Sequence, residues 1–122
     1  MKDFDNWNEI KKKINQRKRI DVKKGSVWLC NLGLNIGYEI DGKNKDYIRP
    51  VLVILGFKRG GGIVLPLTTT DKKSRFIIYI KGNSKVNITQ IRYLDSKSFY
   101  RRVDSVDRKV FDKVIRDFKS LF

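Results

Sequence analysis

Two short apolar runs limit most strongly what this chain can fold into. Residues 51–55 and 63–67 consist largely of Val, Ile and Leu, and the stretch 58–62 between them ends in three consecutive glycines. Apolar, β-branched runs separated by turn residues are typical of a β-hairpin. A phosphate-binding loop is less well supported, because no lysine and hydroxyl residue follow the last glycine. The sequence therefore predicts a hairpin of two buried strands.

Further short apolar runs extend this pattern along the chain. Strands are expected over residues 27–31, 76–80, 86–92 and 99–103, with turns or polar loops between them. Short strands at this spacing, followed by one closing helix, predict a mainly β fold: a small, strongly bent barrel or sandwich.

Helical periodicity occurs at both ends of the chain. Apolar residues from Phe4 to Ile14 recur at spacings of three and four, and Asp3 or Asp5 is the candidate N-cap. At the other end, an amphipathic helix is expected after Ser105, which is its candidate N-cap. Helices are therefore expected to flank the β-rich part on both sides.

Composition limits the function. The 122 residues carry 28 Lys plus Arg against 13 Asp plus Glu, and this net charge of +15 predicts an anionic partner, unless the lysines simply solvate the surface. Histidine is absent, which excludes His-based acid–base catalysis and most zinc sites, and the single cysteine, Cys30, is expected to be a buried thiol. Neither a membrane-spanning stretch nor a signal-type segment occurs, so we expect a cytoplasmic protein that binds no membrane.

Polar residues flank the predicted hairpin at its open end. Arg49 and Pro50 begin the first strand, a long polar loop containing Glu39 precedes them, and three threonines, 68–70, end the second strand. If the strands pair, a cation, a carboxylate and a threonine meet at one edge of the barrel, where they can hold a phosphate. Each also has a structural explanation: a strand-end arginine paired with a carboxylate, a loop charge and edge-strand threonines.

Several short motifs occur in order from residue 23 onwards. They are Lys-Lys-Gly-Ser-Val-Trp at 23–28, Gly-x-Glu at 37–39, Arg-Pro-Val-Leu-Val at 49–53, Pro-Leu-Thr at 66–68, Ser-Lys-Val at 84–86 and Gln-Ile-Arg-x-Leu-Asp at 90–95. Together they resemble the MazF/PemK (Kid) toxins of type II toxin–antitoxin systems. The resemblance implies that residues 23–122 form an SH3-like β-barrel domain that assembles as a homodimer. Residues 1–22 are then expected to form a basic, helical N-terminal extension.

The resemblance also implies an activity. Toxins of this family are sequence-specific endoribonucleases that cut single-stranded RNA without a metal or other cofactor. The RNA 2′-hydroxyl attacks the adjacent phosphorus and leaves a 2′,3′-cyclic phosphate and a 5′-hydroxyl. The family's catalytic arginine and threonine fall on Arg49 and Thr68, and its loop glutamate falls on Glu39. The partner implied is a small, acidic antitoxin protein.

Five further residues are candidates for RNA contacts. Gln90 and Arg92 match the family's Gln-x-Arg element, which shapes the RNA groove, although Arg92 can equally form a structural ion pair. Tyr38 and Tyr47 can stack on unpaired bases or pack the loop down, and Thr69 adjoins the catalytic threonine.

The proton acceptor is the part of the site that the resemblance leaves open. Some family members place Arg-x-Asp ahead of the Gln, with the Asp as base, but here Asn87 and Thr89 stand at these positions. Glu39 is the remaining candidate for orienting the 2′-hydroxyl or accepting its proton. The longer loop at 43–48 also means that cleavage specificity does not transfer.

Two other functions are weighed against the enzyme. One is a non-catalytic, basic SH3-like module that binds RNA or another nucleic acid. The other is a gyrase-poisoning toxin of the CcdB type, which shares the barrel but lacks the Arg-Pro and Thr pair. The joint presence of Arg49 and Thr68 favours the endoribonuclease.

Overall fold

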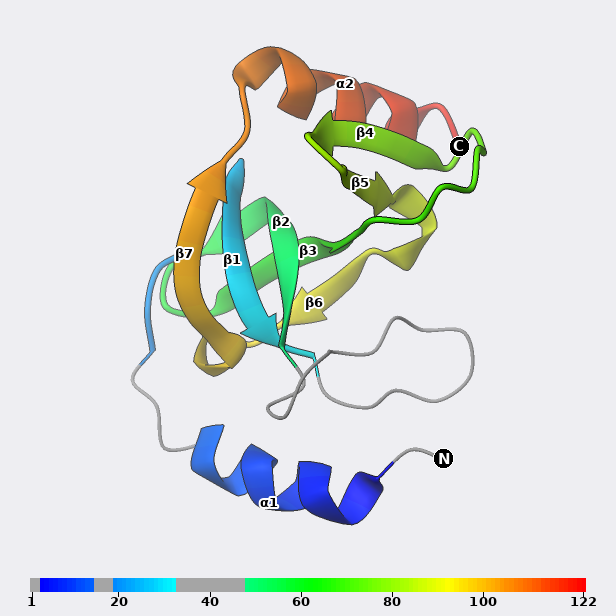
Figure 1. Ribbon diagram of the computed structural model, residues 1–122. Coiled ribbons are helices and arrows are strands. Elements are labelled where there is room, and N and C mark those ends of the chain that lie inside the picture. The colour runs from blue at the N-terminus through cyan, green and yellow to red at the C-terminus, as the bar shows by residue number, and fades with distance from the viewer. Residues whose placement is uncertain (1–2, 15–18, 33–47) are drawn as a thin grey trace.

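The computed structural model describes residues 3–14, 19–32 and 48–122 (Figure 1). Within these residues, one antiparallel sheet is built from seven strands: β1 (Ser26–Asn31), β2 (Ile48–Phe57), β3 (Gly61–Thr68), β4 (Ile77–Lys81), β5 (Ser84–Asn87), β6 (Arg92–Leu94) and β7 (Phe99–Ser105). Neighbouring strands follow the order β4-β5-β3-β2-β1-β7, and β6 also pairs with β3. The sheet is bent into a barrel-like shape but is not closed, and the predicted mainly β fold is confirmed.

Two apolar clusters hold the sheet together, one on each face of its central strands. Successive side chains of a strand point to opposite faces, so Leu52 of β2 belongs to one cluster while Val51 and Val53 belong to the other. The C-terminal helix α2 (Arg108–Lys119) covers the first cluster through the fully buried Val114. The second cluster contains Cys30, whose side chain is buried as expected.

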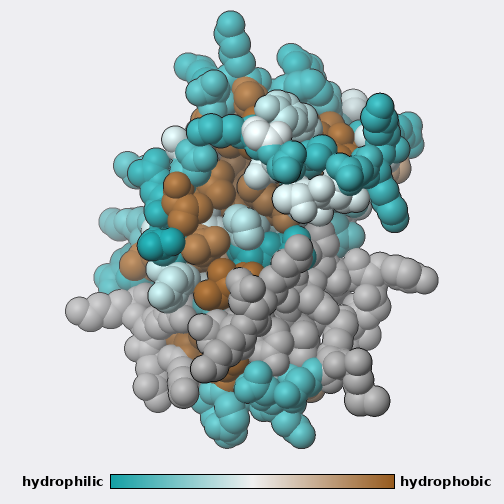
Figure 2. Space-filling model, in the orientation of Figure 1, coloured by the Kyte–Doolittle hydropathy of each residue, from teal (hydrophilic) through white to brown (hydrophobic). Residues whose placement is uncertain are grey.

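The N-terminal helix α1 (Phe4–Ile14) lies at the end of the molecule opposite α2 (Figure 1). Its predicted position is confirmed, and Asp3 caps it, because the Asp3 carboxylate accepts a hydrogen bond of 2.9 Å from the Asn6 backbone N–H. Hydrophilic side chains dominate this end of the molecule, whereas hydrophobic side chains gather towards its middle (Figure 2). Within α1, Ile14 is buried and Trp7 and Ile10 are half-buried, whereas Lys11 and Lys12 are exposed, so the helix is amphipathic.

The predicted central hairpin is confirmed: residues 58–60 form the turn, and Gly61 and Gly62 begin β3 with close backbone contacts. β2 and β3 pair from Val51–Pro66 to Phe57–Gly61. Gly61 has a φ of +91°, and a Cβ placed on it would lie 2.0 Å from the Leu94 carbonyl oxygen. Only glycine accommodates both this conformation and this approach. The start of β3 therefore sits directly against the end of β6.

Two predicted elements were wrong in detail. The strand expected over residues 86–92 is interrupted, because β5 ends at Asn87 and a 3₁₀ turn, η1 (Ile88–Gln90), precedes β6. The Asn87 side chain causes the break by accepting hydrogen bonds from the backbone N–H of Thr89, at 3.0 Å, and from its hydroxyl, at 2.6 Å.

The second error concerns the start of the C-terminal helix. The N-cap is Asp107 rather than Ser105. Ser105 remains in β7, where it pairs with Ser26 of β1, and the following Val106 N–H donates to the Gly25 carbonyl at 2.9 Å. Tertiary strand pairing therefore overrides the capping preference of this serine.

Candidate functional site

Arg49 lies at the beginning of β2, where the hairpin opens. It pairs with Cys30 of β1, and its side chain is half-buried. Its Nη1 donates a hydrogen bond of 2.9 Å to the carbonyl oxygen of Leu67, near the end of β3. This bond spans the two strands and fixes the direction of the planar guanidinium, which carries five N–H donors in total.

Thr68 is the last residue of β3, on the strand that faces Arg49. The last regular pair of the hairpin is Val51 with Pro66, so the same register continued by two residues brings Arg49 opposite Thr68. The Thr68 hydroxyl oxygen accepts a hydrogen bond of 3.3 Å from the Thr70 backbone N–H. This bond holds the threonine side chain in place where the strand gives way to a loop.

Arg49 and Thr68 both line one small cavity. It has a volume of about 90 Å³, and it is lined by Arg49, Pro50, Leu67, Thr68, Thr69 and Ser84. This volume corresponds to roughly three water molecules, which leaves room for a phosphate group. The structure thus places a guanidinium and a hydroxyl around one hollow, an arrangement suited to binding an oxyanion.

The β3–β5 pairing adds two residues to this part of the sheet that were not singled out as site candidates from the sequence. Ser84 lines the cavity, and Lys85 pairs directly with Thr68. The sequence showed Ser84 and Lys85 only as part of a family-like motif. Their position beside the cavity depends on which strands pair, and a linear pattern does not reveal that.

Of the other site residues predicted from the sequence that the structure describes, Thr69 lies at this cavity and the rest lie elsewhere. Thr69 lines the cavity and is exposed, whereas Gln90 ends η1 and Arg92 begins β6. Arg92 lines a separate cavity beside α1. Glu39, Tyr38 and Tyr47 lie outside the described residues.

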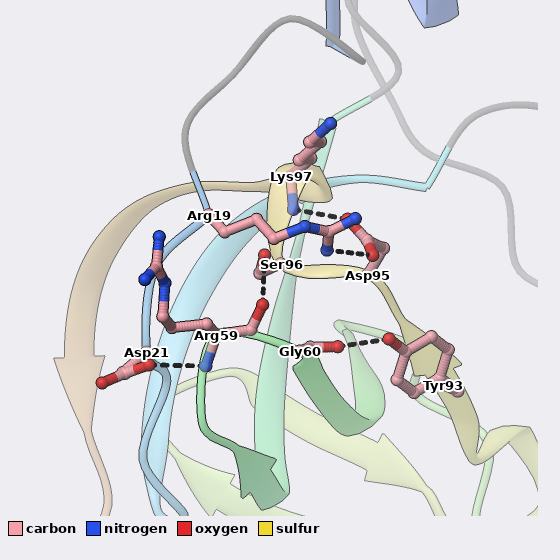
Figure 3. Close-up of polar contacts among 8 residues, drawn as sticks. All are labelled: Arg19, Asp21, Arg59, Gly60, Tyr93, Asp95, Ser96 and Lys97. Atoms are coloured by element: carbon pink, nitrogen blue, oxygen red, sulfur yellow. Dashed lines mark hydrogen bonds and ion pairs between the residues drawn. The ribbon is translucent and has the colours of Figure 1, made fainter.

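A second set of polar residues surrounds the turn of the β2–β3 hairpin (Figure 3). Arg19 donates a hydrogen bond of 2.7 Å to Asp95, whose other oxygen accepts one of 2.9 Å from the Lys97 backbone N–H. Partial burial on its own would raise the pKa of Asp95, but the bonds from Arg19 and Lys97 outweigh it and lower that pKa. The same pair raises the pKa of Arg19.

Backbone groups of the turn take part in the same network. The Arg59 N–H donates to Asp21 at 2.6 Å, the Ser96 hydroxyl donates to the Arg59 carbonyl at 3.3 Å, and the Tyr93 hydroxyl donates to the Gly60 carbonyl. These bonds fasten the segment before β1 and the turn after β6 to the hairpin. The turn network therefore has a structural purpose and is separate from the cavity at Arg49.

No group of three or more Cys, Asp and Glu side chains is arranged to hold a metal ion within the residues that the structure describes. None of the helices in the described part of the chain has the length and apolar character needed to cross a bilayer.

Solved structures with the same fold share little sequence with this chain. MazF (form I) from Deinococcus radiodurans has a TM-score of 0.69 at 20% identity, over 83% of this chain and 96% of that protein. The MazE–MazF complex (form III) from the same organism gives 0.63 at 19% identity, over 82% and 94%. An endoribonuclease in complex with its cognate antitoxin from a mycobacterial species gives 0.60 at 17% identity, over 81% and 92%. At these identities the likeness establishes the fold.

Sequence comparison assigns the family. A search of curated proteins gave no match. The sequence profile of PemK-like, MazF-like toxins of type II toxin–antitoxin systems matches residues 23–122, which is most of the chain. The resemblance seen in the ordered motifs is confirmed. The chain therefore belongs to the PemK-like, MazF-like toxins of type II toxin–antitoxin systems.

Proposed function

We propose that this toxin is a metal-independent endoribonuclease that cleaves single-stranded RNA at a short sequence. The observation that carries the proposal is the cavity shared by Arg49 and Thr68 at the open end of the hairpin. The bond from Arg49 to the Leu67 carbonyl orients the guanidinium before any substrate arrives. Preorganised donors of this kind contribute most to catalysis when charge develops beside them.

The chemistry follows from what a phosphodiester needs. When the 2′-oxygen attacks phosphorus, negative charge grows on the non-bridging oxygens, and a guanidinium can donate to two of them at once. The Thr68 hydroxyl can donate a further hydrogen bond and align the phosphate for in-line attack. The 5′-oxygen leaves and takes up a proton, so that the products are a 2′,3′-cyclic phosphate and a 5′-hydroxyl.

The attacking 2′-hydroxyl must also lose its proton. Asn87 and Thr89, at the positions where some relatives carry Arg and Asp, hydrogen-bond to each other and offer no carboxylate. We assign proton acceptance to Glu39 because of its place in the Gly-x-Glu motif of residues 37–39. A carboxylate can act in this way when it lies within hydrogen-bond reach of the hydroxyl.

The remaining partners follow from family and charge. A net charge of +15 suits both polyanionic RNA and a small, acidic antitoxin. We further propose that residues 23–122 form the catalytic domain, that residues 1–22 form an appended extension, and that the toxin acts as a cytoplasmic homodimer. Tyr38, Tyr47, Thr69, Gln90 and Arg92 are the proposed RNA contacts.

Product analysis tests the activity. Purified protein is incubated with unstructured RNA in EDTA, and the fragments are labelled with polynucleotide kinase to reveal their 5′-hydroxyl ends. We expect cleavage at a short common sequence, and we expect RNA with 2′-O-methyl groups to stay intact. Fragments with 5′-phosphates, or cutting that needs a divalent metal, would contradict the proposal. Salt-sensitive binding without cleavage would instead favour a non-catalytic module. Damaged DNA with intact RNA after expression of the protein in cells would favour a gyrase poison.

A further inference from the structure

A second cavity lies between the N-terminal helix and the sheet. Its volume is about 370 Å³, and it is lined by Trp7, Lys11, Ile14, Asn31, Leu32, Arg92, Leu94 and Ser98. Among the residues that the structure describes, this lining includes two cations and no carboxylate. Helix α1 lies outside residues 23–122, the stretch matched by the family profile. The α1 side of the cavity therefore lies outside the stretch that the family profile matches.

The cavity is on the same side of the sheet as the proposed catalytic residues. The end of β1 that lines it pairs with the start of β2, where Arg49 lies opposite Cys30. Residues two apart in a strand face the same side, so Arg49 shares a face with Val51. Val51 packs in one cluster with Leu32 and Leu94, which line the cavity. The cavity therefore lies near the end of the sheet at which Arg49 begins β2.

The lining combines the groups that bind a nucleotide. Trp7 is half-buried and offers an aromatic ring, Lys11 is exposed, and Arg92 is half-buried. Asn31 and Ser98 add an amide and a hydroxyl. Single-stranded nucleic acid is held by aromatic rings that stack on bases and by cations that contact phosphates. The volume falls within the range of small-molecule pockets, about 300–1,000 Å³.

We propose that this cavity is a subsite for one nucleotide of the RNA strand, outside the scissile step. The base stacks on Trp7, and the adjoining phosphate contacts Lys11 and Arg92. The inference rests on the proposed function in that it takes RNA as the substrate. An acidic peptide could also use the two cations, so the test below includes a peptide probe that separates it from RNA. The N-terminal helix thus extends the RNA-binding surface of the toxin.

A matched pair of lysine variants tests the subsite. Lys11 lines the cavity, whereas its neighbour Lys12 does not: Lys12 lines only a second concavity, which it shares with Lys11, and it pairs with Glu9 at 3.3 Å. Binding of a labelled, randomised 2′-O-methyl RNA is measured by fluorescence anisotropy over a range of salt concentrations. Lys11→Gln should reduce the slope of log affinity against log salt by about 0.7, the value for one lost phosphate contact on a single strand. Lys12→Gln should leave the slope unchanged, and equal slopes for both variants would overturn the proposal.

Variants of Trp7 test the stacking. Trp7→Leu should weaken binding about tenfold without changing the salt slope, and Trp7→Phe should keep most of the affinity. Full affinity in both variants would remove the base from the subsite. If Trp7→Leu loses its thermal unfolding transition, the exposed lysine pair still decides the question.

The same measurements separate this inference from the proposed function and from other partners. The 2′-O-methyl probe cannot be cut, so a defect in binding is seen whether or not the protein cleaves RNA. If Lys11→Gln weakens binding of a polyglutamate peptide and leaves the RNA slope unchanged, the occupant is an acidic protein segment and the RNA subsite is wrong.

Discussion

The two ends of the β2–β3 hairpin use polar groups in opposite ways. At the turn, polar side chains bond chiefly to the backbone, as Asp21 does with the Arg59 N–H and Ser96 with the Arg59 carbonyl (Figure 3). At the open end, the Arg49 side chain reaches across to the Leu67 carbonyl while also lining a cavity. The turn thus uses hydrogen bonds to hold the chain, whereas the open end uses one to aim a charged group.

The comparison shows that residue type alone does not separate a structural arginine from a catalytic candidate. Arg59 and Arg49 belong to the same hairpin, but the hydrogen bonds of Arg59 with Asp21 and Ser96 are made by its backbone. Arg49 contributes its guanidinium. If the open end of the hairpin is catalytic and the bonds at the turn only stabilise the fold, substitutions at the open end should change the cleavage rate. Substitutions at the turn should change the stability.

Replacing the two arginines in turn gives the largest expected contrast. Arg49→Ala should lower the rate of RNA cleavage by about 10²–10³-fold, because it removes a preorganised donor to the phosphate. Arg59→Ala removes the same charge at the other end and keeps the backbone bonds, so cleavage should change little. Initial rates on a defined RNA substrate measure both. Equal losses in the two variants would mean that charge alone, rather than position, matters.

Adding a side chain to Gly61, the first residue of β3, should destabilise the attachment of the hairpin to β6. Gly61→Ala should lower the free energy of unfolding by about 3 kcal/mol, because a Cβ would lie 2.0 Å from the Leu94 carbonyl oxygen at a positive φ. Gly82 also has a positive φ, of +56°, but nothing lies within 4 Å of a Cβ there. Gly82→Ala should therefore cost only about 1 kcal/mol. Urea denaturation of both proteins provides the comparison, and similar losses would show that the close contact is unimportant.

Substitutions of Thr68 sharpen the assignment at the open end. Thr68→Val keeps the shape of the side chain and removes the hydroxyl, so cleavage should fall to about one tenth, the effect of one lost hydrogen bond. Thr68→Ser should restore most of the rate. Steady-state cleavage of the same RNA distinguishes them, and a Val variant as active as the Ser variant would leave Thr68 with a packing role only.

The smallest effect concerns the ion pair between Arg19 and Asp95. Because the pKa of Asp95 is lowered in the folded protein, the pair stabilises the fold above the ordinary pKa of an aspartate and loses this effect as the pH falls through the folded value. Both side chains are more than a third exposed, so solvent screens the pair and its stabilisation should be small. Asp95→Asn should lower the melting temperature slightly at neutral pH, and the difference should vanish in acid.

A matched substitution on the surface controls for the change in net charge. Asp112 lies on α2, where its pair with Arg108 is long, at 3.9 Å, and more exposed. Asp112→Asn should leave the melting temperature nearly unchanged across the same pH range. A loss for Asp95→Asn that persists in acid would point to a packing defect in place of a lost ion pair.

Much of the fold could be predicted from the sequence because local pattern and tertiary structure agree there. The apolar runs of β1 to β4 and the periodic residues of both terminal helices specify their elements directly. Prediction failed where distant segments decide the outcome. Ser105 has the features of a helix cap, but pairing with Ser26, far away in the sequence, keeps it in a strand.

The candidate site shows the same division. Arg49 and Thr68 could be selected from adjacent motifs, because hairpin pairing is local and brings strand ends together. The neighbouring Lys85 became visible only through the pairing of β3 with β5. Arg92 was expected to shape the RNA groove, and the structure adds that it shares a cavity with Trp7, a relation across most of the chain. Contacts between residues so far apart in the sequence produce no periodic pattern from which they could be predicted.

The position of Val22 sets a limit on how far this toxin can be trimmed. Val22 precedes the family-matched stretch by one residue, but it is buried in the second core cluster. A Cβ on Gly56 would lie 1.8 Å from its carbonyl oxygen, and one on Gly62 would lie 3.3 Å from its side chain. A shortened protein beginning at residue 23 would expose this part of the core to water. We therefore expect the catalytic domain to need Val22, one residue of the extension, in order to fold.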